Sequence, residues 1–320
     1  MVMHTGTFSE ATRPTVPGNG LTLAIAKWRE TTQETGNISS RVFNDDLGQR
    51  MGTSWNSPKF GALNAENLNA TEEITNFQQM TSSNVVITPG EVGLAIKIAK
   101  KSEAQWSESV ALRAGRIMRD GKERKIDADL GGLAASFTTF TLGAAATVLT
   151  PGLLAAGKSR LKAGSNTAAA AIAAGAPSNR APAGPIDGFF RWESLTQVMR
   201  SLIGGATTGT VGTTSIAAPG SGKGAEALED LFVSKVAGVN VFGNSNFAKD
   251  ASDDTVGMII HGDAIAYIPF AHEGANGTPF VRDSEDGRFY QTTLVVDYGF
   301  GILDQFYGIA VTTDATAPTA

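Results

Sequence analysis

The spacing of apolar residues changes part-way along the segment from Thr88 to Leu133, and this change limits the possible folds most strongly. From Val92 to Ala99 every second residue is large and apolar, which predicts a strand with one buried face. From Ser102 the apolar residues recur at steps of three and four, which predicts a helix to about Leu133. Unbroken, that helix would be roughly 45 Å long.

Two details bear on this predicted helix. Ser102 and Gln105 have the spacing of a capping box at its start. Gly115 and Gly121 lie inside it, and each costs about 1 kcal/mol relative to Ala, so a helical hairpin broken near Gly121 is the alternative. Basic residues separate the apolar positions, and this charged face would be solvated in a monomer or contact acidic groups of a neighbour in an assembly.

A polar segment precedes the strand, from Gly52 to Ser83, and is rich in Asn, Thr, Ser and Gln. Its sparse apolar residues follow neither the helical nor the strand period for long. Because a free polar loop of this length is unusual inside a compact domain, we interpret it as a projecting hairpin whose partners lie on another chain. The following "TPGE" (Thr88–Glu91) has Pro and Gly where a type II turn needs them.

The rest of the chain predicts a mixture of helices and strands. Pro151 in the first turn and Gly164 after the last one bound one helix, and Phe190 lies on the apolar face of the next. Helices are predicted over residues 150–164, 189–205 and 227–236. Strands are predicted over residues 238–247, 255–270, 290–298 and 306–312. The fold class is therefore α+β with a mostly antiparallel β component.

Composition excludes several classes of protein. The chain has no cysteine, which excludes disulfides, thiolate catalysis and cysteine-bound zinc. Its net charge of -5 and pI near 5.3 argue against binding to nucleic acid by phosphate neutralisation, although not against enclosing it. The apolar stretches Leu142–Gly157 and Ala168–Ala176 are too short or too interrupted to span a bilayer, and the N-terminus lacks a signal peptide.

The candidate catalytic and metal motifs are incomplete. "PGSGKG" resembles a phosphate loop, but Ala217 and Gly224 replace the required first glycine and the hydroxyl residue. His272 lacks a second histidine four residues later, and His261 with His272 is more simply a structural pair than a metal site. The acidic residues of 282–289 do not have the spacing of a calcium loop and predict a β-turn around Asp286-Gly287. We therefore predict no cofactor, no metal and no enzymatic activity.

Four quoted stretches occur in a characteristic order. They are "EVGLAIKIAKKSEAQWSESVALRAG", "KIDADLGGLAASF", "VNVFGNSNF" and "TTLVVDYGFGILDQFYGIAV". Together with a proline-bearing N-terminus and a projecting hairpin, this order resembles the major capsid protein of tailed double-stranded-DNA bacteriophages, which has the HK97-like fold. The resemblance spans about Leu21 to Thr313, and "KIDADLGGL" and Tyr298-Gly299 are its most specific parts.

The resemblance implies an architecture and a set of partners. The implied parts are an N-terminal arm (1–45), an extended β-hairpin loop (46–88), a peripheral domain with a long spine helix (89–164), an axial domain (165–279), and C-terminal strands that return to the peripheral domain (280–320). It implies hexamers and pentamers of an icosahedral shell around double-stranded DNA, without sequence-specific binding and without a membrane. A portal at one vertex, and a decoration or cement protein, are further implied partners, and the location is the virion after assembly in the host bacterial cytoplasm.

The resemblance also points to candidate inter-subunit contacts and to departures from the family. The candidates are Trp55, Lys59, Phe60, Leu63, Phe77, Arg113 and Arg116. The founding member is made with an N-terminal scaffolding region, for which there is little room here, so a separate scaffolding protein or a self-assembling subunit is expected. That member also has a Lys–Asn crosslink. Lys59 lies in the matching loop, but no matching Asn or catalytic Glu is found, so no crosslink is expected.

Two other classes of function stay open at this point. An encapsulin-like nanocompartment shell protein has the same fold but encloses enzymes, and the Pro/Gly-rich N-terminus speaks against it. A soluble enzyme with an unrecognised site is the other alternative. Particles tens of nanometres across would favour a shell, whereas a small oligomer with turnover would favour an enzyme.

Overall fold

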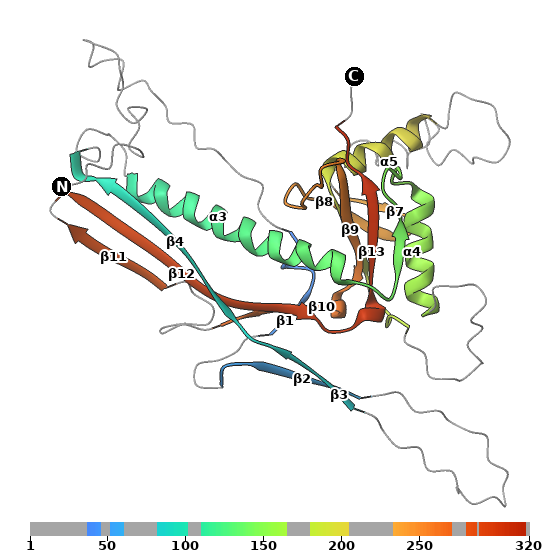
Figure 1. The fold of residues 1–320 in the computed structure, drawn as a ribbon, viewed down its shortest axis with the longest axis horizontal. Coiled ribbons are helices and arrows are strands. Elements are labelled where there is room, and N and C mark those ends of the chain that lie inside the picture. Colours follow the sequence, from blue (N-terminus) through green and yellow to red (C-terminus); the bar gives the residue numbers. More distant parts are fainter. Residues whose placement is uncertain are drawn as a thin grey trace, which may run out of the picture.

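The computed structural model describes residues 37–45, 52–60, 82–101, 110–164, 180–204, 233–270, 280–286 and 288–317. Within these residues the chain is α+β, with two larger sheets, a separate two-stranded hairpin and three α-helices (Figure 1). The helices are α3 (Val110–Gly132), α4 (Pro151–Ala163) and α5 (Trp192–Gly204). The first strands are β1 (Phe43–Asn44), β2 (Trp55–Phe60), β3 (Ser82–Ile87), β4 (Gly90–Ala99), β5 (Thr141–Gly143) and β6 (Ile186–Phe190).

The remaining strands lie in the second half of the chain. They are β7 (Val233–Val236), β8 (Val239–Gly243), β9 (Asp254–His261), β10 (Ile265–Pro269), β11 (Phe280–Asp286), β12 (Phe289–Ile302) and β13 (Gly308–Asp314). Short 3-10 turns follow three of the elements: η2 (Leu133–Ser136), η3 (Gly262–Ala264) and η4 (Gln305–Tyr307).

The five-stranded sheet is built around β12. This strand pairs antiparallel with β4 from Phe289↔Ala99 to Tyr298↔Gly90, and with β11 and β10 on its other edge. Helix α3 covers one face, where Met118 and Leu130 pack with Leu94 of β4 and Leu294 of β12. Figure 1 shows α3 running lengthwise along this sheet. The two periodicities predicted between Thr88 and Leu133 therefore bury their apolar faces against each other.

The six-stranded sheet has the order β5-β13-β9-β6-β8-β7, with α4 and α5 packed beside it (Figure 1). The chain passes between the two sheets through η3, from β9 to β10, and through η4, from β12 to β13. The amide of Leu303 donates to the carbonyl of Ala264 at 2.8 Å, which joins the two crossings. Phe189 and Met258 of this sheet share a core with α3 and with Leu294, so one core connects both sheets.

Several sequence predictions agree with the helices. Helix α3 runs through Gly115 and Gly121 without a break, so the alternative of a broken hairpin is wrong. Its expected start, with the capping box, lies outside the described residues. Thr150 caps α4 by accepting a hydrogen bond from the Leu153 amide at 3.3 Å, and Gly164 ends it with φ 67°, as predicted.

Two predicted helices are partly strands. Phe189 and Phe190 are fully buried in β6, a central strand that is covered on both faces and therefore shows no alternation; α5 begins only at Trp192. Residues 233–236 form β7, which pairs antiparallel with β8. Ala237 and Gly238 both have positive φ (52° and 81°), and this backbone makes the two-residue turn of a hairpin.

The predicted turn at Thr88–Glu91 is also wrong. Gly90 is not among the residues with positive φ, and it begins β4. Strands β3 and β4 do not pair with each other; β3 pairs with β2 and β4 pairs with β12, so the chain continues from one sheet into another. By contrast, Asp286 pairs with Phe289, so the chain reverses between them as predicted.

The sheets divide the chain differently from the expected domain bounds. β5 and α4, expected in the peripheral domain (89–164), belong with the six-stranded sheet, and so does β13 from the C-terminal part (280–320). β10, expected in the axial domain (165–279), lies in the five-stranded sheet. The reason is that β13 pairs between β9 and β5 and completes the six-stranded sheet, which the order of elements along the chain does not reveal.

Candidate inter-subunit surface

The hairpin of β2 and β3 has one face toward the body and one face away from it. The strands pair antiparallel from Trp55↔Ile87 to Phe60↔Ser82. Exposure alternates along β2, so Trp55, Ser57 and Lys59 are half-buried while the residues between them are exposed. We call the exposed side the outer face. It consists of Asn56, Pro58, Phe60, Ser82, Asn84 and Val86.

The outer face carries large apolar side chains in water. Phe60 is 58% exposed and Val86 is 56% exposed, the two highest values among the large hydrophobic residues of the described chain. Figure 1 shows the hairpin lying apart from both larger sheets, below β10 and β12 in this view. Two large exposed apolar side chains on one face of a two-stranded sheet, which is marginally stable alone, indicate a surface that another molecule covers.

The base of the hairpin is anchored to its own body. Ile87 is buried with Ala266 and Ile268, and Trp55 and Val85 pack against this cluster. Two glycines of β12 make this contact possible. A Cβ on Gly299 would lie 2.7 Å from the Ile87 side chain, and one on Gly301 would lie 3.2 Å from it. The "YGFG" stretch has glycine at every second residue, which puts both glycines on one face of the strand; this is the sequence signal that would have indicated the close approach.

The inner face of the hairpin has partners in the same chain. The Trp55 indole Nε1 donates to Asp45 at 2.9 Å, and its ring lies 6.1 Å from that of Phe43. The Lys59 ammonium forms an ion pair with the nearly buried Asp304 and lies 5.4 Å from the centre of the Tyr307 ring. Burial, followed by the negative charge of Asp304, raises the pKa of Tyr307. The expectation that the hairpin lacks partners in its own chain is therefore wrong for this face.

The other candidate residues are placed as follows. Leu63 and Phe77 lie outside the described residues. Arg113 is in α3, with its side chain outside the described part, and Arg116 is exposed on the same helix. Residues 37–45 of the expected arm pack on the body through buried Ile38 and Val42 and through β1, so the arm too has partners in its own chain there. Of the two aromatic candidates in the described chain, Trp55 packs on a buried cluster whereas Phe60 is exposed.

The "KIDADLGGL" stretch, singled out in the sequence, has a structural task. Asp129 accepts a hydrogen bond of 2.6 Å from the Tyr298 hydroxyl of β12, and Lys125 donates to the same carboxylate at 2.6 Å. Burial, and then this hydrogen bond, raise the pKa of Tyr298. The contact joins α3 to the strand at the centre of the five-stranded sheet.

We expect Tyr298→Phe to lower the free energy of unfolding by about 1.5 kcal/mol, because a hydrogen bond to a charged group is lost and nothing else changes shape. Urea denaturation measures this. In an Asp129→Ala background the same substitution should have an effect close to zero. An equal effect in both backgrounds would show that the hydrogen bond does not contribute.

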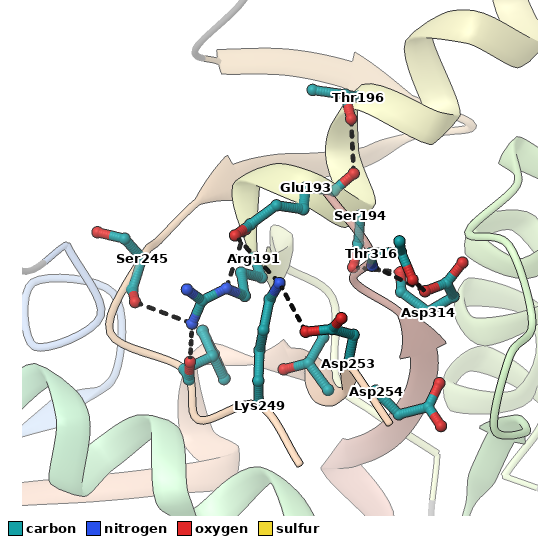
Figure 2. Close-up of polar contacts among 12 residues, drawn as sticks. Arg191, Glu193, Ser194, Thr196, Ser245, Lys249, Asp253, Asp254, Asp314 and Thr316 are labelled. Atoms are coloured by element: carbon teal, nitrogen blue, oxygen red, sulfur yellow. Dashed lines mark hydrogen bonds and ion pairs between the residues drawn. The ribbon is translucent and has the colours of Figure 1, made fainter. Parts of the chain in front are cut away.

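A second polar cluster, shown in Figure 2, lies at the start of α5. Arg191 Nε donates to Glu193 at 2.9 Å, and Lys249 lies 3.5 Å from Glu193 and 3.3 Å from Asp253. Burial opposes the charged form of Glu193, but the hydrogen bonds from its own backbone amide and from Arg191, with the nearby cations, lower its pKa. Hydrogen bonds from Thr316 lower the pKa of Asp314. This cluster is a network of ion pairs and hydrogen bonds.

These two lowered pKa values predict acid sensitivity. A carboxylate with a depressed pKa stabilises the fold above its ordinary pKa, and this stability is lost as the pH falls through the folded-state value. At pH values under about 4.5, the ordinary pKa of Glu193, the melting temperature should therefore decrease as the pH is lowered. Glu193→Gln should be less stable than the parent at pH 7 by roughly 0.2–1 kcal/mol, and the difference should shrink by pH 3. A difference that grows on acidification would contradict this assignment.

The catalytic and metal candidates from the sequence do not form a site in the described chain. No three His, Cys, Asp or Glu side chains gather there in a group that fits a metal ion. His261 is buried and accepts a hydrogen bond from the Asp263 amide at 3.3 Å, while His272 and "PGSGKG" lie outside the described residues. In the same described ranges, no helix is both long and apolar enough to cross a membrane.

Comparison with known proteins gives a clear result only at the level of structure. No protein-family model and no curated protein matches the sequence. The capsid of Ralstonia phage GP4 matches with a TM-score of 0.68 at 9% identity, over 92% of this chain and 96% of that one. The capsid of cyanophage P-SCSP1u matches with a TM-score of 0.65 at 12% identity, over 98% and 96%.

The chain has a phage-capsid fold. This confirms the fold class and the resemblance that the sequence order predicted. The SrpI encapsulin of Synechococcus elongatus PCC 7942 matches as well, with a TM-score of 0.55 at 9% identity, over 95% of this chain and 99% of that one. The phage-capsid fold is therefore shared with an encapsulin, and the likeness to the two phage capsids is the stronger.

Proposed function

We propose that the chain is the major capsid protein of a tailed bacteriophage. Copies of it assemble as hexamers and pentamers into an icosahedral shell that encloses double-stranded DNA. The observation that carries this proposal is the outer face of the hairpin, where Phe60 and Val86 are exposed although the other face is anchored to the body. The phage-capsid fold over nearly the whole chain supports it.

Burial of apolar surface between copies favours assembly. A hairpin held at its base projects a stable apolar surface, and an adjacent copy is the partner that a shell always supplies at the same place. Stable interfaces of permanent assemblies commonly bury 2,000–5,000 Å² or more. The outer face of the hairpin would supply part of this area. Basic residues of α3, the sequence candidates Arg113 and Arg116 among them, are proposed as partners for acidic groups of a neighbour. A net charge of -5 disfavours tight binding to the enclosed DNA.

Within this proposal the five-stranded sheet with α3 forms the peripheral domain and the six-stranded sheet forms the axial domain at the hexamer and pentamer centres. A separate scaffolding protein, a portal at one vertex and a decoration or cement protein are the expected partners. The protein assembles in the host cytoplasm and resides in the virion. A structural subunit needs neither a catalytic residue nor a cofactor.

Size-exclusion chromatography and negative-stain microscopy of the purified full chain test the proposal. We expect capsomers that convert to closed shells, alone or after co-expression with a candidate scaffolding protein. A monomer at all concentrations, with and without that partner, would contradict the proposal.

A compartment that encloses enzymes is the second candidate, because the fold likeness extends to the SrpI encapsulin. Neighbouring genes and particle contents separate the two. Terminase and portal genes, with DNA in the native particles, support the phage capsid. An enzyme gene beside the gene for this chain, with that enzyme inside the particles, supports the compartment.

A further inference from the structure

One buried carboxylate joins three distant parts of the molecule. Asp127 of α3 is only 1% exposed, and its two oxygens accept three hydrogen bonds. The Ile38 amide donates at 3.0 Å, the Asn246 side chain donates at 3.1 Å, and the Asn244 side chain donates as well. A buried charge is tolerated only when hydrogen-bond donors surround it, so the three donors and Asp127 form one interdependent cluster.

Asp127 holds a segment that bridges both larger sheets. We call residues 37–45 the strap. At one end Asn37 donates to the carbonyl of Gly243, the last residue of β8 in the six-stranded sheet, at 3.2 Å. At the other end β1 pairs with β10 in the five-stranded sheet. Figure 1 shows the strap, in blue, running from beside α3 to β10. Between these ends, Ile38 and Val42 are both buried.

The partners of Asp127 are themselves fixed in orientation. Asn244 is 2% exposed, its amide donates to the carbonyl of Phe190 at 2.9 Å, and its side-chain oxygen accepts the Asn246 amide at 2.7 Å. The side-chain nitrogen of Asn244 must therefore point toward Asp127. Position 127 needs two acceptor oxygens, which Asp supplies and Asn does not.

We propose that Asp127 is the positioning residue that fixes the strap and thereby sets the angle between the two sheets. This rests on the proposed shell function for its consequence. In a shell of identical copies the angle within each subunit contributes to the curvature between subunits, so a loosened strap produces particles of mixed size.

Hydrogen exchange on the unassembled subunit tests the contact itself. In Asp127→Asn an amide group faces the two Asn donors, so exchange at Ile38 and Arg41 should become about tenfold faster. The double substitution Asp127→Asn with Asn244→Asp restores one donor and one acceptor and should return exchange to within about threefold of the parent. Asp129→Asn, in the same helix but bonded to Tyr298, is the matched control and should leave exchange in the strap unchanged.

Particle diameter measured by electron microscopy is the second readout. Asp127→Asn should broaden the distribution of diameters and the double substitution should narrow it again, a rescue that loss of stability alone does not predict. Should Asp127→Asn fail to fold, Asn246→Ala removes one donor and should still raise exchange about threefold. Unchanged exchange in either variant, or no rescue by the double substitution, would overturn the proposal. If the parent forms no shell, the function fails while hydrogen exchange still decides the role of Asp127.

Discussion

Replacing Phe60 and Val86 together by Ser is expected to abolish shell assembly and to leave the folded subunit intact. Both side chains are more than half exposed on the outer face, so the subunit loses little of its own core. Burying each against a neighbour contributes roughly 1.5–3 kcal/mol, and this loss is repeated at every equivalent contact of a closed shell.

Negative-stain microscopy counts the particles, and a thermal melt of the same sample shows that the fold is kept. Val148→Ser is the matched control, since Val148 is 45% exposed but lies on the loop before α4, away from the hairpin. It should assemble like the parent. Shells of normal yield from the double variant would show that the outer face is not an interface.

Replacing Gly299 by Val is expected to destabilise the subunit by about 3 kcal/mol. Its Cβ would lie 2.7 Å from the Ile87 side chain and 3.2 Å from the Pro89 backbone nitrogen. Pro89 connects β3 to β4, so a shift of its backbone would disturb the pairing of both strands. Overpacking of this kind typically costs 1–3 kcal/mol, and the base of the hairpin should loosen as well.

Urea denaturation measures the loss, and Gly93→Val is the matched control in the paired strand β4. A Cβ on Gly93 meets only the Leu294 carbonyl at 3.9 Å, an ordinary contact, so stability should change by less than about 0.5 kcal/mol. Adding Ile87→Ala to Gly299→Val removes the clashing atoms and should lower the cost attributed to position 299. Equal effects of the two valines would contradict the close approach.

Local patterns predicted the elements whose burial is one-sided. β4 and α3 were predicted from Val92 to Leu133 because each buries one face, and that face produces a period in the sequence. β6 was missed because Phe189 and Phe190 are buried on both faces, which removes the alternation. The first part of "ALEDLFVSKV" has a helical pattern, and the predicted helix was extended to Val236. Residues 233–236 are instead the strand β7, which Ala237 and Gly238 connect to β8 by a hairpin turn.

The candidate site was predicted only in outline. Its polar composition indicated a hairpin, and Phe60 was named among the contact residues. The pairs that anchor the inner face, Trp55 with Asp45 and Lys59 with Asp304, could not be predicted, because no local rule links residues that meet through tertiary structure. The same reason hid the strap and its contact with Asp127.

The role of "KIDADLGGL" became clear only from its surroundings. Residues two apart on a helix point about 200° apart, so Asp127 and Asp129 face different partners. Asp127 accepts from the strap and from the loop after β8, and Asp129 accepts from Tyr298 of β12. A stretch that served in the sequence as a mark of family resemblance thus connects α3 to both larger sheets.

A cryo-electron-microscopy reconstruction of the purified particles tests the central claim most directly. The account predicts a closed shell of hexamers and pentamers in which Phe60 and Val86 are buried against an adjacent copy. Particles that leave both side chains in solvent, or a lone subunit whose hairpin needs no second chain, would contradict it.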